Sequence, residues 1–448
     1  MRVEELVAGV DDRSARGIAA GVSRLVRSGA AKEGERLPTV REVASALGVS
    51  PTTVSEAWQA LTAAGAIEPR GRSGTFVRAQ PHPHGPLRYR RITESPGHYR
   101  LDLSTGTPDP ALLPDLKRAL SKLGRKDLTT NYLDDPVVPE LDGVLRARWP
   151  FSPEGLTVVD GCLDALDRVS SVVVGFGDRV LVEATTFPPL LDLLEDLGAE
   201  VIPVAIDEEG LVPSSLEAGL THDPVALFVQ PRSHNPSGIV LTERRAKKLV
   251  PLLRGKATMI VEDDHAGDVS CAPLVSFGRH FPERTVHISG FSKSHGPDLR
   301  LAAVGGAGAV VESVVSRRRL GAGWSSRILQ RVLATMLSEP QHTGVAEARE
   351  VYAARRAAMA SALLERGVDT GGSDGFYLWV PVRDEQSALV ALASQGIGAS
   401  PGTPFEAQPP GVDHIRVTVG LVTDDADGLA DALVAAGTVG TTPRRGRA

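Results

Sequence analysis

The stretch MIVEDDHAGD, residues 259–268, sets the class of the fold. It begins with an apolar run typical of a strand covered on both faces, and it ends in three acids. Acidic side chains at the C-terminal end of a strand point into the crevice where open α/β sheets bind ligands. The stretch therefore predicts a buried strand ending in a ligand site, with Asp263 as the carboxylate of interest. Taken alone, the acids suit a metal site or a solvated cluster equally well.

Similar apolar runs recur on both sides of this stretch, and helical segments such as 162–174, 187–197 and 243–254 lie between several of them. Repeated alternation of strand and helix predicts an α/β domain with a mostly parallel, seven-stranded sheet. Strands near 376–380 and 414–419, mixed with helices, predict a smaller α+β lobe. The seven strand candidates are 156–159, 180–183, 200–204, 225–229, 258–262, 285–289 and 301–304.

A lysine and an arginine follow one of these strands in HISGFSKSHGPDLRLAAVGG, residues 287–306. A lone loop lysine is normally a solvated surface charge. A lysine that forms a Schiff base needs an anion site and a group that holds a cofactor ring beside it. Lys293 stands just past the strand, and Arg300 is suited to bind a phosphate in a bidentate manner. The pair is therefore a candidate cofactor site.

Three more strand ends carry groups suited to a phosphate or a flat ring. The glycine turn of VVDGCLDAL opens a helix whose first backbone N–H groups, at Gly161, Cys162 and Leu163, can bind phosphate. Asn235, in SHNPSG, is placed to donate a hydrogen bond to a ring oxygen, although NPSG is also a common turn. Phe187, in TTFPP, is placed to stack on a ring.

These motifs together resemble the fold-type-I pyridoxal-phosphate enzymes of the class I/II aminotransferase group, from about Asp102 to residue 437. The resemblance implies pyridoxal 5′-phosphate as cofactor. By this resemblance Lys293 forms the Schiff base, Asp263 binds the pyridine nitrogen and Asn235 binds the ring oxygen O3′. Arg300 and the turn at Gly161 would bind the phosphate, and Phe187 would stack on the ring. Tyr132 would reach the neighbouring subunit's phosphate, and Arg416 would bind a substrate carboxylate.

The chain departs from this family pattern at several positions. His265 stands where a tyrosine usually binds O3′, and Gly290 replaces the hydroxylated residue that is common three positions before the lysine. The helix after Gly161 begins Cys162-Leu163-Asp164 instead of Ala-Gln, and the stretch after Tyr132 lacks the usual glycine-rich turn. A histidine can still donate to O3′, but it ordinarily titrates near neutral pH. These changes weaken the case for efficient transamination more than the case for cofactor binding.

The N-terminal stretch LPTVREVASALGVSPTTV, residues 37–54, predicts a helix-turn-helix. Thr39 and Glu42 have capping-box spacing, and Gly48 ends the first helix. The second helix begins at Pro51, and its first residues, such as Thr52 and Thr53, would enter the major groove.

A hairpin wing is predicted to follow in AIEPRGRSGTFV, residues 66–77, where Gly71 and Gly74 permit a tight turn with Arg70 and Arg72 at its tip. The segment resembles the GntR family of winged-helix regulators, whose pattern LPxxRxLAxxLGVSxxTV is nearly all present. The resemblance implies DNA contacts by Arg41 and by Thr52 or Thr53, with Gly71 as the wing glycine. Pro51 and Ser55 replace basic residues of many members, so affinity would rest more on wing and linker arginines. These are Arg70, Arg72, Arg78, Arg88, Arg90, Arg91 and Arg100.

The bulk properties fit such a two-part protein. The chain has 448 residues, a formal net charge of −6 and two cysteines. The length predicts two or more domains, and the charge excludes a general nucleic-acid coat while leaving room for a local DNA-binding face. With no disulfide framework, secretory leader or membrane-length apolar stretch, we expect a cytoplasmic protein with no membrane partner.

We expect a winged helix-turn-helix over 1–78, a linker over 79–100, a cofactor-binding domain over 101–437 and a basic tail over 438–448. The cofactor-binding domain would divide into a large lobe of about 130–310 and a small lobe of about 311–437. By this layout the chain is identified as a member of the MocR subfamily of GntR-type regulators.

Membership implies a homodimer that binds a DNA operator and senses a small amino compound or pyridoxal phosphate itself, without dedicated turnover. The effector would displace Lys293 from the cofactor, the lobes would shift, and the linker would pass that shift to the winged helices. Two other hypotheses stay open. One is a working aminotransferase with a regulatory DNA-binding domain. The other is a DNA-binding protein whose α/β domain has lost the cofactor and serves only dimerisation.

Overall fold

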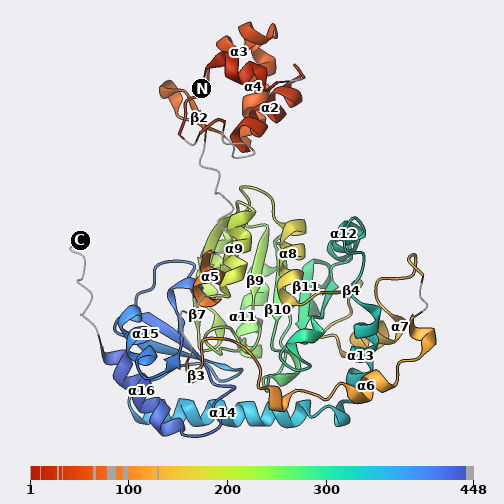
Figure 1. Cartoon of the computed structure of the whole chain (residues 1–448), viewed down its shortest axis with the longest axis vertical. Helices are drawn as coiled ribbons and strands as arrows, with labels where there is room; N and C mark the ends of the chain where they lie inside the picture. Colours follow the sequence, from red (N-terminus) through yellow and green to blue (C-terminus); the bar gives the residue numbers. More distant parts are fainter. Residues whose placement is uncertain are drawn as a thin grey trace. The chain divides into compact units, whose positions relative to one another are not determined.

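The computed structural model describes residues 2–10, 12–27, 30–32, 34–63, 67–77, 87–93, 99–128 and 131–439 (Figure 1). Arg78, the first part of the predicted linker and residues 440–448 of the predicted tail lie outside these ranges, as does the side chain of Arg72. The chain divides into two compact units, Met1–Gly85 and Pro86–Ala448.

The first unit is a small helical domain with a two-stranded hairpin. The side chain of Thr39 accepts a hydrogen bond from the Glu42 N–H, and the Glu42 carboxylate accepts one from the Thr39 N–H, so the predicted capping box forms. Gly48 ends α3 with a left-handed φ of 66°. The elements are α1 (Val3–Ala8), α2 (Ala15–Arg27), α3 (Val40–Leu47), α4 (Pro51–Ala63), β1 (Ile67–Pro69) and β2 (Thr75–Val77).

The second unit contains a seven-stranded sheet in the order β4-β12-β11-β10-β9-β5-β6. Each predicted strand forms: β4 (Gly155–Val159), β5 (Arg179–Glu183), β6 (Glu200–Val204), β9 (Ala226–Val229), β10 (Met259–Asp264), β11 (Thr285–Gly290) and β12 (Ala302–Gly306). The pairings are parallel except that β12 runs antiparallel to both of its neighbours. In the described chain no α-helix lies between β11 and β12; the loop that carries Lys293 and Arg300 connects them and includes a short 3-10 helix, Pro297–Leu299.

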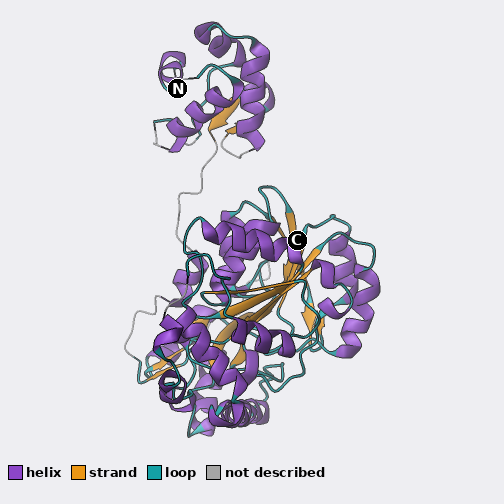
Figure 2. Ribbon diagram, turned by 90° about the vertical axis from the view of Figure 1, so that its right-hand side faces the viewer, coloured by secondary structure: helices purple, strands orange, loops and turns teal. Residues whose placement is uncertain are grey.

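Helices cover both faces of this sheet (Figure 2). Side chains of α8 (Cys162–Val173), α9 (Pro188–Asp196) and α12 (Gly308–Arg319) share one hydrophobic cluster with the strands, whereas α10 (Pro213–Leu220) and α11 (Glu243–Leu253) share another. Strand β10 therefore lies deep inside the unit, as its solidly apolar start predicts. Further elements of this lobe are α6 (Lys117–Ser121), α7 (Pro139–Arg148), β7 (Ile206–Asp207), β8 (Gly210–Leu211) and α13 (Arg327–Ser338).

The predicted smaller lobe forms around an antiparallel sheet of β13 (Tyr377–Val382), β16 (Asp413–Thr418) and β15 (Ser400–Pro401). Its helices are α14 (Val345–Glu365), α15 (Glu385–Ala393) and α16 (Ala426–Thr438). An earlier segment also joins it, because β3 (Leu101–Asp102) pairs in parallel with β14 (Ile397–Gly398). Among the described residues, no helix is long and apolar enough to cross a membrane.

The predicted linker over 79–100 contains a helix at 87–93, since α5 (Leu87–Thr93) forms there and packs on α9; residues 94–98 lie outside the described ranges. Its partners, Asp192 and Glu195, lie far away in the sequence, so no local pattern announces it. The side chain of Arg88 pairs with both acids and is not the free positive charge that the sequence suggested.

One carboxylate fastens the loop before β13 to the loops after β9 and β10. Asp374 is buried and accepts hydrogen bonds from the Ser233 and Ser270 hydroxyls and, at 2.9 Å, from the Cys271 N–H. The carboxylate therefore ties the start of β13 to the edge of the large sheet where the candidate residues gather.

We predict that Asp374→Ala lowers the midpoint of thermal unfolding strongly, because it leaves several buried donors without an acceptor, at a cost of about 3 kcal/mol. Asp369→Ala is the matched control, since that exposed carboxylate accepts a hydrogen bond from the Gly371 N–H in the same loop. Equal midpoints for the two variants would contradict the fastening role.

Candidate functional site

The C-terminal ends of three adjacent parallel strands bring the candidate residues together. Strand β10 lies between β9 and β11, with Glu262 opposite Val229 and Asp263 opposite Ile288. The loop after β9 carries Asn235, and the loop after β11 carries Lys293. Parallel pairing therefore gathers polar groups from distant parts of the sequence at one edge of the sheet.

The three acids of β10 have separate surroundings. Glu262 accepts hydrogen bonds from the Ser276 hydroxyl and the Phe277 N–H, and Asp264 binds the Arg232 guanidinium at 2.8 and 2.9 Å. Within the described ranges, no His, Cys, Asp and Glu side chains form a metal-binding cluster. These contacts favour neither a solvated acidic patch nor a metal centre.

Of the three acids, Asp263 is the one with a carboxylate oxygen that accepts no hydrogen bond within the described structure. It is 5% exposed, and its Oδ2 accepts a hydrogen bond of 2.9 Å from the Gln230 amide. Its Oδ1 is buried and has no hydrogen-bond partner among the described residues. Burial raises the pKa of this carboxyl to about 7, against the hydrogen bond from Gln230, which lowers it. A buried oxygen of this kind suits the protonated nitrogen of a flat ring, so the fold fits the cofactor at this point.

Gln230 is a site residue that the sequence analysis did not identify. Its amide nitrogen binds Asp263, and its Oε1 accepts a hydrogen bond of 2.8 Å from the Asn235 backbone N–H. One side chain therefore sets the positions of both residues. The available signal was a polar residue directly after the apolar strand β9 (Ala226–Val229).

Arg416 and Asn235 come into direct contact. The guanidinium Nη1 donates to Asn235 Oδ1 at 3.3 Å, and Nη2 donates to the Ser104 carbonyl. Because the amide oxygen is taken, the Asn235 amide nitrogen remains as the donor toward a ligand. Arg416 is 4% exposed, and its guanidinium lies about 5 Å from the rings of Tyr377 and Phe405. Burial lowers its pKa, and a ligand carboxylate would compensate its charge.

The start of α8 and Arg300 form a cradle suited to a phosphate. No side chain caps α8, so its first N–H groups, at Cys162 and Leu163, face outward from the helix start. A Cβ added to Gly161 would lie 3.4 Å from the Arg300 guanidinium, which therefore rests against this helix start. Lys293 is half-buried, and its amine donates to the Gly106 carbonyl. The amine is thus held by a neutral acceptor.

Two departures from the family pattern prove to be neighbours. A Cβ added to Gly290 would lie 2.5 Å from the Cys162 Sγ, so the thiol fills the space that a side chain at position 290 would need. Burial, and next the charge of Asp263, raise the pKa of the Cys162 thiol well above its usual value, which keeps it neutral. The glycine and the cysteine are therefore a matched pair.

His265 behaves differently from the expectation of a group that titrates near neutral pH. Burial and then the charge of Lys293 lower its pKa to about 3, so the ring is neutral under ordinary conditions. Both ring nitrogens are buried without a partner in the described structure. A neutral imidazole offers one donor and one acceptor, which suits the ring oxygen of the cofactor.

Two expected residues stand apart from these contacts. Phe187 is the half-buried residue that precedes the first turn of α9, and the N–H of its neighbour Thr186 donates to the Phe405 carbonyl at 2.8 Å. Tyr132 is 85% exposed and lies beside Trp324, with ring centroids 5.9 Å apart. The single chain therefore does not bring Tyr132 into contact with the site.

The candidate DNA contacts lie on α3, α4 and the hairpin. Arg41 and Thr52 are exposed, whereas the Thr53 hydroxyl lies 2.9 Å from that of Ser50 and helps to begin α4. Arg70 stacks 4.9 Å from the Phe76 ring and pairs with Glu68. Gly71 turns the wing with a φ of 54°. Arg41 and Thr52 are thus the more open candidates.

Comparisons with known proteins agree with this arrangement. Residues 100–433 match the family described as aminotransferase class I and II, and residues 14–77 match bacterial regulatory proteins of the gntR family. The chain is 32% identical over 431 residues to the vitamin B6 salvage pathway transcriptional repressor PtsJ of Salmonella typhimurium, covering 93% of this chain and 96% of that protein. It is 29% identical to the HTH-type transcriptional regulator TauR of Rhodobacter capsulatus, covering 86% and 88% of the two chains.

A third relative, the HTH-type pyridoxine biosynthesis transcriptional regulator PdxR of Corynebacterium glutamicum, is 28% identical and covers 62% of each chain. Among solved structures, kynurenine aminotransferase of Pyrococcus horikoshii matches 78% of this chain and 93% of its own, with a TM-score of 0.69 and 23% identity. The α-aminoadipate aminotransferase LysN of Thermus thermophilus gives a TM-score of 0.68 at 22% identity, with 78% and 97% covered. These structural matches establish the fold.

We predict that Asp263 titrates with a pKa near 7 in the protein without added ligand, and that Gln230→Ala raises this pKa further. The variant removes a hydrogen bond that favours the ionised form, while burial still favours the protonated form. Infrared difference spectroscopy of the carboxyl band measures this titration, and Asp263→Asn identifies the band. A carboxyl that ionises near its ordinary value of 3.8 would refute the assignment.

Proposed function

Because the chain belongs to the MocR subfamily of GntR-type transcriptional regulators, with an aminotransferase class I and II domain, we propose that it binds pyridoxal 5′-phosphate at the Lys293–Asp263 site and senses ligands there. The protein is a DNA-binding transcriptional regulator. The observation that carries the proposal is the buried, unpartnered Oδ1 of Asp263 at the end of β10.

Each neighbouring group has a task toward such a cofactor. Asp263 would hold a proton on the ring nitrogen, and the Asn235 amide together with neutral His265 would orient the ring oxygen. Arg300 and the first N–H groups of α8 would bind the phosphate, as a guanidinium and a helix start do. Phe187 would cover the ring. When bound, the cofactor supplies a carbonyl that combines with amines, and Lys293 is the amine of the chain that is placed for it.

The ligand that is sensed is an amino compound with a carboxylate, or pyridoxal 5′-phosphate itself. Buried Arg416, whose Nε has no partner in the described chain, supports a carboxylate. The names of PtsJ and PdxR, which refer to vitamin B6 salvage and to pyridoxine biosynthesis, support the cofactor as its own effector. Titration with the cofactor alone, and with the cofactor plus an amino acid, separates these two possibilities.

We further propose that the protein works as a cytoplasmic homodimer. Tyr132 and Leu133 are 85% and 91% exposed on one turn, and large exposed side chains of this kind favour a protein contact. A partner subunit that covered this turn would bring Tyr132 toward a phosphate, as the resemblance implies. A two-fold dimer also matches a DNA site with two half-sites.

A working aminotransferase is the second candidate, since Lys293, Asp263 and Asn235 lie at the sheet edge and Arg416 of β16 contacts Asn235. Incubation with an amino donor and a keto acid distinguishes the two functions. Many turnovers per site support the enzyme, whereas a single conversion or none supports the sensor.

We predict that the purified protein with pyridoxal 5′-phosphate shows the near-ultraviolet or visible absorption of a lysine-bound cofactor, and that Lys293→Ala abolishes this absorption. Lys256→Ala, on an exposed loop, is the matched control and keeps it. Asp263→Asn weakens cofactor affinity by about tenfold or more, because it removes a charged hydrogen bond. A wild-type protein that stays colourless after reconstitution rules the cofactor role out.

We predict that Arg41→Ala weakens binding to the promoter fragment upstream of the protein's own gene, measured by gel shift over a series of salt concentrations. Loss of one phosphate contact reduces the salt slope by about one. Arg2→Ala is the control, because the Arg2 side chain is 81% exposed in an ion pair with Glu5. If both variants bind DNA as the wild type does, Arg41 is not a DNA contact.

A further inference from the structure

Helix α5 is the first element of the second unit. It begins at Leu87, and the unit begins at Pro86. The chain that leads from the winged-helix unit therefore enters the cofactor-binding unit through this helix. Figure 1 shows α5 next to α9, at the side of the large sheet that faces the small lobe.

The first turn of α5 is fastened to the large lobe. The Asp192 carboxylate accepts hydrogen bonds from the backbone N–H groups of Arg88 and Tyr89, at 3.3 and 3.0 Å. These are orphan donors of a helix start, and the negative charge also suits the helix dipole. The Arg88 guanidinium binds Glu195 at 2.6 Å. Both acids belong to α9, the helix that begins directly after Phe187.

The other end of α5 rests on the small lobe. Ile92 is 7% exposed and packs with Trp379 of β13 and with Phe405, which is fully buried. The Phe405 ring also lies 4.9 Å from the Arg416 guanidinium. Phe405 therefore links the proposed carboxylate-binding arginine to the helix that leads to the DNA-binding unit, because it contacts the first and shares a cluster with Ile92 of the second.

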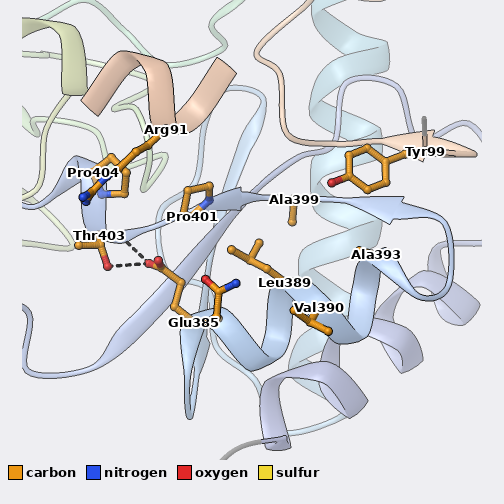
Figure 3. Close-up of a pocket in the computed structure, with 11 residues that line it drawn as sticks. Arg91, Tyr99, Glu385, Leu389, Val390, Ala393, Ala399, Pro401, Thr403 and Pro404 are labelled. Atoms are coloured by element: carbon orange, nitrogen blue, oxygen red, sulfur yellow. Dashed lines mark hydrogen bonds between the residues drawn. The ribbon is translucent and has the colours of Figure 1, made fainter. Parts of the chain in front are cut away.

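The contact between α5 and the small lobe is bordered by open space. A cavity of about 510 Å³ lies between Arg91 of α5, Tyr99, the apolar face of α15 and the segment Thr403–Pro404 (Figure 3). The Glu385 carboxylate holds that segment by accepting hydrogen bonds from the Gly402 and Thr403 N–H groups. This cavity leaves open space beside α5 on the side of α15, so the helix has room to change its position relative to the small lobe.

We propose that α5 couples the ligand state of the site to the DNA-binding unit, and that Ile92 and Phe405 form the contact that transmits it. When Arg416 binds a ligand carboxylate, its guanidinium changes its hydrogen-bond partners, and the Phe405 ring then repacks between Arg416 and Ile92. Because Asp192 keeps the first turn on α9, the helix tilts and changes the direction of the chain that leads to the winged helices. A ligand drives this shift by binding one arrangement more tightly than the other.

The coupling rests on the proposed function, so its test reports cofactor binding and helix movement separately. Hydrogen–deuterium exchange of residues 87–93 is measured on the full-length protein in three states: without ligand, with pyridoxal 5′-phosphate, and with pyridoxal 5′-phosphate plus L-alanine. Absorption is recorded on the same samples. We expect the cofactor band to appear and the exchange of the α5 amides to differ between the states. A band without any exchange difference overturns the coupling, whereas absence of the band overturns the proposed function and the coupling with it.

Variants then locate the contact. Ile92→Ala keeps the absorption band and loses both the ligand-dependent exchange difference and the ligand-dependent change in affinity for the promoter fragment. Leu87→Ala is the matched control, because Leu87 lies on the same helix and is 53% exposed, and it responds as the wild type does. Ile92→Val, which keeps most of the buried side chain, restores the response if Ile92→Ala disturbs folding. An Ile92→Ala protein that binds the cofactor and responds as the wild type does refutes the assignment.

Discussion

The site depends on a buried carboxylate that the fold leaves half satisfied. Asp263 is held at the end of a strand with parallel neighbours on both sides, so it cannot move toward water. Gln230 binds one of its oxygens, and the other has no partner in the described structure. A buried polar atom without a hydrogen bond is costly, and proteins retain few of them. A ligand that donates a hydrogen bond to this oxygen would remove that cost, so the buried carboxylate favours a ligand at this residue.

At the positions that depart from the family pattern the residue types differ, but the packing and the hydrogen-bonding capacity of the site are kept. The Cys162 thiol occupies the space that Gly290 leaves open, so the pair preserves the packing beside the phosphate cradle. His265 stays neutral because it is buried near the Lys293 amine, and a neutral ring can donate one hydrogen bond where a tyrosine hydroxyl would. Neither change removes a charge that the cofactor needs. Both remove hydroxyl groups that the family pattern usually carries.

The sequence predicted the structure correctly where the pattern lay within one strand and the residues directly after it. Each of the seven strands of the large sheet lies on a predicted apolar run, and Asp263, Asn235 and Lys293 follow such runs. It was uninformative where the stabilising partner is distant. Helix α5 exists because Asp192 caps it from about a hundred residues away, and Gln230 matters through contacts with Asp263 and Asn235 that only the sheet creates. The antiparallel direction of β12 was likewise unpredictable, because an apolar run does not reveal which way a strand is paired.

The same helix also changes how the basic stretch between the two units should be interpreted. Its arginines suggested a reservoir of positive charge for DNA, but Arg88 is bound to Asp192 and Glu195 and stabilises the cofactor-binding unit. An ion pair held in this way contributes little to phosphate binding. The more open candidates for DNA contact lie in the winged-helix unit, where Arg41 and Thr52 are exposed. In the proposed mechanism, ligand binding would act on DNA by altering how the two winged helices of the proposed dimer are presented to their half-sites, and a helix fixed at one end is well suited to that task.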